Sequence, residues 1–155
     1  MTNIKHLFTL ICRESIIDHE TNNLSINQIY EELKFDIAIP EDAHLKRNDQ
    51  DPVGIQLPLE VTSMFYREKM DSEEDLKLTL IFLDPSDKEL GKFELPFKFI
   101  ESQRRVRTRM KLNSIALTKR GTYHFKVLLS IGESEMELLE TIPLDIMVNV
   151  TTSNT

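Results

Sequence analysis

Apolar residues recur at every second position along most of the chain, and this spacing predicts β-strands with one buried and one exposed face. The predicted inward rows run from Leu57 to Phe65, Leu76 to Phe82, Phe93 to Phe99, Val106 to Leu112, Tyr123 to Leu129 and Ile142 to Val150. Turn residues such as Asp84-Pro85-Ser86-Asp87 separate the runs. The pattern predicts an all-β fold, an antiparallel two-sheet β-sandwich of about 7–9 strands.

Two positions in this pattern carry further expectations. Pro96 interrupts the row from Phe93 to Phe99, and a proline has no N–H to donate to a sheet ladder, so this strand is expected at a sheet edge or at a bulge. Beside the row from Leu57 to Phe65, the alternate positions Glu60, Thr62 and Tyr66 are expected on the exposed face.

The N-terminal third is less regular. Residues 7–13 form an apolar run that reads as a strand. Residues 24–35 fit both a helix with a capping box and a strand, and we favour the strand because the first strand otherwise lacks a hairpin partner. Residues 36–54 are charged and irregular and predict a long loop. We expect a single domain over residues 1–150 and a frayed tail over residues 151–155.

The segment from Leu117 to Phe125 resembles the tyrosine corner of immunoglobulin-like Greek-key sandwiches, in which a Leu and a Gly precede a Tyr that opens the penultimate strand. The resemblance implies an immunoglobulin-like or C2-like Greek key and a structural role for Leu117, Gly121 and Tyr123. The cysteine of antibody domains would fall at Phe125, and the chain has no Trp, so the antibody branch is excluded.

The whole chain also resembles an uncharacterised family of small bacterial and phage-associated β-sandwich proteins. The likeness lies in the strand Phe8-Thr9-Leu10-Ile11-Cys12, in the segment from Leu24 to Ile29, and in the run Gly-x-Tyr-x-Phe-x-Val from Gly121 to Val127. That family has no established activity, so the resemblance implies a fold and no function.

A row of basic residues is the first candidate site. Arg105, Arg107, Arg109 and Lys111 alternate with apolar residues, so on a strand they project from one face, with Arg104 nearby. Guanidinium groups bind oxyanions through two parallel hydrogen bonds, so the row is a candidate for binding an acidic partner or phosphates. The alternative is a solvated strand face, or an edge that charge protects against aggregation. The loop over residues 36–54 is a second candidate contact surface.

Acidic turns are the second candidate site. Strands that run up and down place alternate turns at one end, which would gather Asp71, Glu73, Asp75 and Glu133 there. Carboxylates from several loops are what a calcium ion needs, and C2 sandwiches bind calcium through loops at one end. No Asp-x-Asp spacing supports the site, so no metal or other cofactor is expected.

Composition narrows the function further. The chain has 155 residues and a formal net charge of −7, which disfavours nucleic acid as the default partner. Cys12 is the only cysteine, so no intramolecular disulfide is possible and a cytoplasmic location is expected. No nucleophile and base pair or metal-binding spacing is recognisable, so we expect no enzyme. The prediction is a binding module that acts on a protein partner or on itself through the basic face or an open sheet edge; the alternatives are polyanion binding along the row and calcium-dependent binding.

Overall fold

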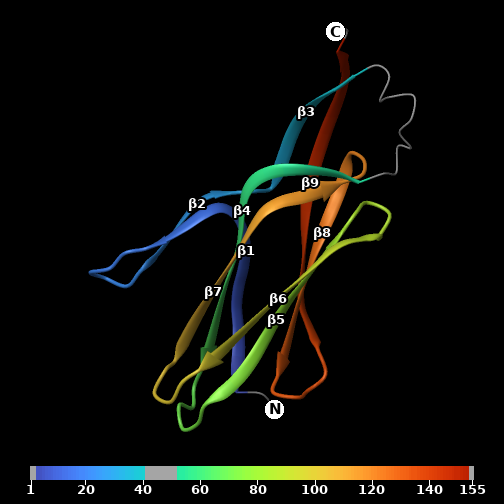
Figure 1. The fold of residues 1–155 in the computed structure, drawn as a ribbon. Helices are drawn as coiled ribbons and strands as arrows, with labels where there is room; N and C mark the ends of the chain where they lie inside the picture. The colour runs from blue at the N-terminus through green and yellow to red at the C-terminus, as the bar shows by residue number, and fades with distance from the viewer. Residues whose placement is uncertain (1–2, 41–51, 154–155) are drawn as a thin grey trace.

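The computed structural model describes residues 3–40 and 52–153, which form nine strands and no helix. The strands are β1 (Ile4–Ile17), β2 (Leu24–Ile29), β3 (Glu32–Pro40), β4 (Val53–Arg67), β5 (Glu74–Leu83), β6 (Glu89–Phe99), β7 (Arg105–Leu117), β8 (Gly121–Ile131) and β9 (Glu137–Ser153). They make two curled sheets, ordered β2-β1-β4-β7 and β3-β9-β8-β5-β6 (Figure 1). The prediction of an all-β, antiparallel-rich sandwich is confirmed. Within the described ranges no helix is long and apolar enough to cross a membrane.

The predicted inward rows form the core between the sheets. Val61 and Phe65 of β4 face Leu78 and Leu80 of β5, and all four are fully buried. Tyr123, Phe125 and Val127 of β8 are also buried, with the Phe82 ring stacked 4.6 Å from that of Phe125. Because each row alternates with polar residues, burying one face of every strand is enough to hold the two sheets together.

Strand β6 lies at the edge of its sheet, as Pro96 predicts. Pro96 is opposite Lys77 of β5, the one strand of the described residues that pairs with β6, and the β5–β6 register shifts between Phe82 and Leu83 near the end of β5. A residue without an N–H is tolerated here because the outer side of an edge strand needs no ladder partner.

The segment from Leu24 to Phe35 is strand over Leu24–Ile29 and again from Glu32, which confirms the favoured prediction, but it divides between the two sheets. Strand β2 pairs with β1 as the expected hairpin partner, and β3 then joins the other sheet beside β9. Tyr30 N–H donates to Ile11 O at 2.8 Å, and Asp145 N–H donates to Glu31 O at 3.1 Å, so the change of sheet falls between these two residues. The β3–β9 pair is parallel, the exception to the antiparallel pattern.

Two expectations about irregular segments are wrong. The loop predicted over residues 36–54 is strand at both ends, because β3 continues to Pro40 and β4 begins at Val53; residues 41–51 lie outside the described residues. The frayed tail predicted from residue 151 is strand through Ser153, because Thr151 to Ser153 continue the ladder beside Ala38 to Pro40. Threonine suits a strand, so polar composition alone does not end one.

The turn before β8 is held by the buried Tyr123 side chain. Its hydroxyl accepts the N–H groups of Thr118 at 3.0 Å and Lys119 at 3.1 Å and donates to Lys119 O. Leu117 is buried beneath the turn. Gly121 has a φ of +146°, and a Cβ there would lie 2.8 Å from Pro85 Cγ, so a side chain has no room. These contacts tie the β7–β8 turn to the β5–β6 turn.

At the opposite end a buried arginine joins three segments. The Arg67 guanidinium donates to Gln103 O at 2.9 Å, Ser72 O at 2.6 Å and Ile100 O at 2.6 Å, and it lies 4.9 Å from the centre of the Phe99 ring. Three carbonyl acceptors compensate a charge that is completely removed from water. Arg67 therefore fixes both the turn from β4 into β5, through Ser72, and the turn from β6 into β7, through Ile100 and Gln103.

Candidate functional site

The basic row lies on β7, the edge strand of the β2-β1-β4-β7 sheet. Val106, Thr108, Met110 and Leu112 are buried, while Arg105, Arg109 and Lys111 are exposed and Arg107 is half-buried. The four basic side chains therefore share the outer face of the sheet, because successive side chains on a strand point to opposite faces. Arg104 immediately precedes the strand and is exposed.

A hairpin from the start of the chain reaches this row. Among the described residues, strand β1 pairs with β4 only from Ile4 to Cys12, and beyond that point it pairs only with β2. We call the freed hairpin, residues 13–27, the arm. In Figure 1 the arm is the blue hairpin that leaves β4 and projects past β7 on the left.

Two arginines of the row attach the arm to β7. Arg109 Nη1 donates to Ser15 O at 3.1 Å. Arg107 donates to Asn22 twice, from Nη2 to the backbone carbonyl at 2.5 Å and from Nη1 to Oδ1 at 3.3 Å. The buried Arg107 Nε has no hydrogen-bond partner among the described residues. The row therefore splits into two arginines that hold the arm and three cations, Arg104, Arg105 and Lys111, that do not.

Polar residues of β4 lie buried beneath the arm, contrary to the expectation that Glu60 and Thr62 face water. The Glu60 carboxylate accepts the hydroxyl protons of Ser15 and, at 2.8 Å, of Thr62, and both Glu60 and Thr62 are almost completely buried. Cys12 lies beside them with Sγ 3.9 Å from Thr62 Oγ1, and burial raises the pKa of the Cys12 thiol. Ser15 of the arm thus gives the buried Glu60 carboxylate one of its two hydrogen-bond partners.

The tip of the arm is a tight polar turn. The Asp18 carboxylate accepts the Thr21 N–H at 2.7 Å, the Thr21 hydroxyl at 3.0 Å and the Glu20 N–H at 2.9 Å. These bonds favour the charged form and lower the pKa of Asp18. Asn22 has a φ of +55°, a conformation that Asn tolerates better than most residues. The turn presents the Asn22 carbonyl to Arg107.

Tip and strand enclose a pocket of about 470 Å³. Its residues come from the arm and from the start of β7: Ile17, Thr21, Asn22, Asn23, Gln103, Arg104, Arg105 and Arg107. The Arg105 guanidinium lies 5.6 Å from the centre of the Tyr66 ring, which restricts it to the outer face. We call this the cationic pocket. Three of the five basic residues singled out from the sequence thus line one concave surface, and Arg109 and Lys111 do not.

No protein-family model and no curated protein matches this chain. The likeness to small bacterial and phage-associated sandwich proteins therefore stays a prediction.

The acidic turns proposed for calcium meet only in part. Lys98 Nζ lies 3.3 Å from Glu73 Oε2 and 3.4 Å from Asp75 Oδ1, and hydrogen bonds to these two carboxylates raise the pKa of the lysine. Asp75 and Glu133 line one shallow pocket, to which Asp71 does not contribute. Across residues 3–40 and 52–153 no group of three or more His, Cys, Asp or Glu side chains is arranged to share a metal ion.

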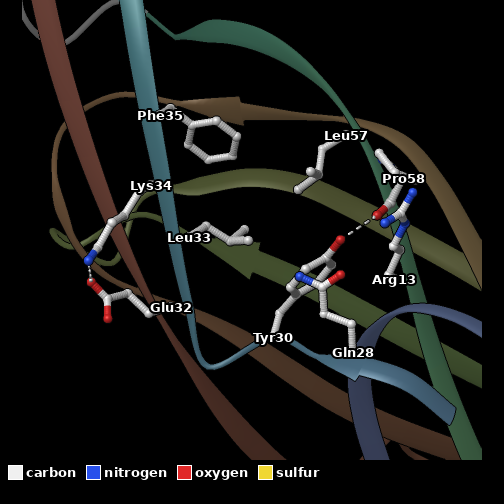
Figure 2. Close-up of a pocket in the computed structure, with 9 residues that line it drawn as sticks. All are labelled: Arg13, Gln28, Tyr30, Glu32, Leu33, Lys34, Phe35, Leu57 and Pro58. Carbon is white, nitrogen blue, oxygen red and sulfur yellow. Dashed lines mark hydrogen bonds and ion pairs between the residues drawn. The ribbon is translucent and has the colours of Figure 1, made fainter.

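A second cleft, of about 550 Å³, opens between β3 and β4. Figure 2 shows Leu33 and Phe35 of β3 pointing toward Leu57 of β4 across it, with Tyr30 closing one end through a hydrogen bond to Pro58 O at 3.2 Å. We call this the β3–β4 groove. The second contact surface expected from the sequence, residues 36–54, contributes none of its described residues, 36–40 and 52–54, to the groove.

The arm contribution to the cationic pocket was not expected from the sequence. Nothing in the alternation indicates that the turn around His19 to Asn23 contacts residue 107. The signal that existed was Asp18 two and three residues before Glu20 and Thr21, a spacing typical of a side chain that caps its own turn. This spacing predicts a rigid tip, but it does not predict which residue the tip contacts.

Proposed function

We propose that the protein is a non-enzymatic binding module that captures an acidic segment of a partner protein in the cationic pocket. The observation that supports this most directly is the convergence of Arg104, Arg105 and Arg107 on one concavity. Arginine suits this role because its planar fork donates two parallel hydrogen bonds to a carboxylate. Arg104 and Arg105 supply the exposed donors, because Arg107 binds the arm and its Nε is buried.

Charge distribution supports a short acidic segment over a long polyanion. The chain carries a formal net charge of −7, so its overall field repels a nucleic acid along most of the surface. A local group of three arginines attracts a few carboxylates without needing a basic surface around it. Cys12 is buried and is the only cysteine, which agrees with the proposed cytoplasmic location.

The test measures binding of a fluorescein-labelled oligoglutamate peptide by fluorescence anisotropy. We expect the double variant Arg104→Glu and Arg105→Glu to weaken the Kd by about tenfold or more, because two attractive charges become repulsive. These two residues are chosen over Arg107 and Arg109 because their side chains do not hold the arm. The matched control reverses Lys92 and Lys126 on the outer face of the other sheet, and it should leave the Kd unchanged.

Two results would contradict the proposal. One is a wild-type chain that does not bind the peptide; the other is equal loss of binding in the Arg104/Arg105 variant and in the control. A single-stranded oligonucleotide is the second probe. If it binds more tightly than the peptide and its affinity falls steeply with added salt, nucleic acid replaces a protein as the partner.

A further inference from the structure

Strand β3 is the sheet edge best suited to pair with a second copy of the chain. Four strands end the two sheets: β2 and β7 in one, β3 and β6 in the other. Strand β2 has six residues and belongs mostly to the arm. Strand β6 carries Pro96, and proline blocks a ladder bond on whichever side its nitrogen faces. Self-pairing of β7 would bring basic side chains together, and like charges directly opposite each other destabilise a sheet.

Strand β3 carries charges of alternating sign on its exposed face. Glu32, Lys34 and Asp36 are all exposed, and Lys34 Nζ lies 3.4 Å from Glu32 Oε1. Figure 2 shows the Lys34–Glu32 pair on the opposite side of the strand from Leu33 and Phe35. A negative, positive, negative row is complementary to itself when two copies run antiparallel, whereas a row of one sign is not.

The backbone of β3 has free hydrogen-bonding groups at these same residues. Glu31 O accepts Asp145 N–H of β9, and bonding groups alternate along a strand, so Leu33 and Phe35 also bond toward β9. The N–H and C=O of Glu32, Lys34 and Asp36 therefore point to the other side, where no strand pairs with β3 within the described residues. An added strand would satisfy these groups.

The groove beside β3 supplies apolar surface for the same contact. On the β1 side, β4 pairs only from Glu60 to Arg67, so its Val53 to Leu59 half has no strand there among the described residues. Leu33, Phe35 and Leu57 line the gap between this half of β4 and the β3 edge, and Phe35 and Leu57 are only partly buried. Burying these side chains against an apolar row of an added strand would stabilise the contact in addition to the backbone hydrogen bonds.

We propose that two copies of the chain pair antiparallel through β3, with Phe35 opposite Phe35 of the second copy. This register places each Lys34 opposite Asp36 of the other copy, as a hydrogen-bonded pair on the exposed face. Both phenylalanine rings then lie on the groove side, over Leu33 and Leu57. The dimer joins two five-stranded sheets into one continuous sheet.

Neighbouring registers either have less favourable charge pairs or depend on different residues from the proposed register. Because every second residue of β3, namely Glu32, Lys34, Asp36 and Ala38, has outward backbone groups, the register can change only in steps that keep residues of this set opposite one another. One step in one direction places Lys34 opposite Lys34 and Glu32 opposite Asp36, so all these pairs repel. One step in the other direction places Asp36 opposite Asp36, which repels, and Lys34 opposite Ala38. Two steps in the first direction pair Glu32 with Lys34 and remove Asp36 from any charge pair. Only the proposed register depends on both Lys34 and Asp36.

The test is sedimentation velocity of the full chain over a dilution series. Wild type should show a concentration-dependent dimer. Lys34→Glu and Asp36→Lys should each weaken dimerisation by about tenfold, because two symmetric pairs become repulsive. The double variant, which carries both changes, should restore wild-type dimerisation. Lys92→Glu on the edge strand β6 is the matched control and should have no effect, and circular dichroism checks that every variant is folded.

Three outcomes would overturn the inference. A wild-type chain that stays monomeric at every concentration excludes the dimer. An effect of Lys34→Glu without one of Asp36→Lys excludes the register. A double variant as weak as the single variants excludes pairing between Lys34 and Asp36. None of these results bears on the peptide assay, since β3 contributes no residue to the cationic pocket.

Discussion

Strands β7 and β3 both end a sheet and both expose a row of charged side chains, yet the rows differ in sign and in what they contact. The β7 row is entirely basic, and two of its arginines bind backbone carbonyls of the arm. The β3 row alternates in sign, and its lysine contacts a carboxylate of the same strand. Beside β7 the surface is covered by the arm; beside β3 it opens into a groove.

This difference teaches how charge order at an edge selects a neighbour. A row of one sign repels its own copy and attracts carbonyl or carboxylate oxygens, so β7 suits the arm and an acidic partner. A row of alternating sign attracts its own antiparallel copy, so β3 suits self-association. Protection against unwanted pairing is therefore stronger at β7 than at β3.

The largest expected effect compares a glutamate of β4 that is buried next to the β7 edge with a glutamate exposed on the β3 edge. Glu60→Ala should destabilise the fold by about 2–3 kcal/mol and lower the Tm by roughly 5–10 °C, because the buried Ser15 and Thr62 hydroxyls lose their acceptor. Glu32→Ala on exposed β3 should change stability by no more than about 0.5 kcal/mol. Thermal unfolding at a protein concentration where the wild type is monomeric measures both.

Glu60→Gln sharpens this prediction. The amide keeps an acceptor oxygen, so Glu60→Gln should lower the stability of the fold less than Glu60→Ala does. If Glu60→Ala and Glu32→Ala cost the same, the arm does not cover β4 in solution and the contrast between the edges fails.

A smaller effect is expected at the arginines that hold the arm. Arg109→Ala removes the bond to Ser15 O, and we expect a loss of about 1 kcal/mol together with faster hydrogen exchange across residues 13–27. The matched change Lys34→Ala should leave exchange of the β3 amides unaltered in the monomer, because the Lys34 side chain contacts only Glu32 of its own strand among the described residues. Unchanged exchange in the arm of Arg109→Ala would show that this arginine does not hold it.

The alternation in the sequence was sufficient for the strands and for the faces that form the core. The Val106 to Leu112 row and the edge position of the Pro96 strand are both confirmed, since each depends on a local property of the chain. Strand was also the correct choice for Leu24 to Phe35. Alternation does not indicate to which sheet a strand belongs. The change of sheet between β2 and β3 at Tyr30 was therefore not predicted.

The candidate site was less predictable because it depends on contacts between distant residues. The basic row was visible, but the contact between Arg107 and Asn22 spans 85 positions. The expectation that Glu60 faces water followed from the same alternation that located its strand, and it failed because the arm adds a second cover on the outer face. Nothing in the sequence around Glu60 indicates that a hairpin from another part of the chain lies over it.

The smallest effect concerns pH at the arm tip. Hydrogen bonds from Thr21 and Glu20 lower the pKa of Asp18. The Asp18 carboxylate of the folded tip therefore binds a proton at a lower pH than in the unfolded chain, in which the pKa of Asp is about 3.9. The stabilisation by these bonds is therefore complete above that unfolded value and is lost as the pH falls through the lower folded value. In an NMR titration the Thr21 amide should shift with a midpoint below about 3.9. The shift should be absent in Asp18→Asn, whereas the Leu33 amide of β3 should not follow this transition. A Thr21 midpoint at the unfolded value would mean that the carboxylate does not cap the turn, and the rigid tip that presents Asn22 to Arg107 would need another cause.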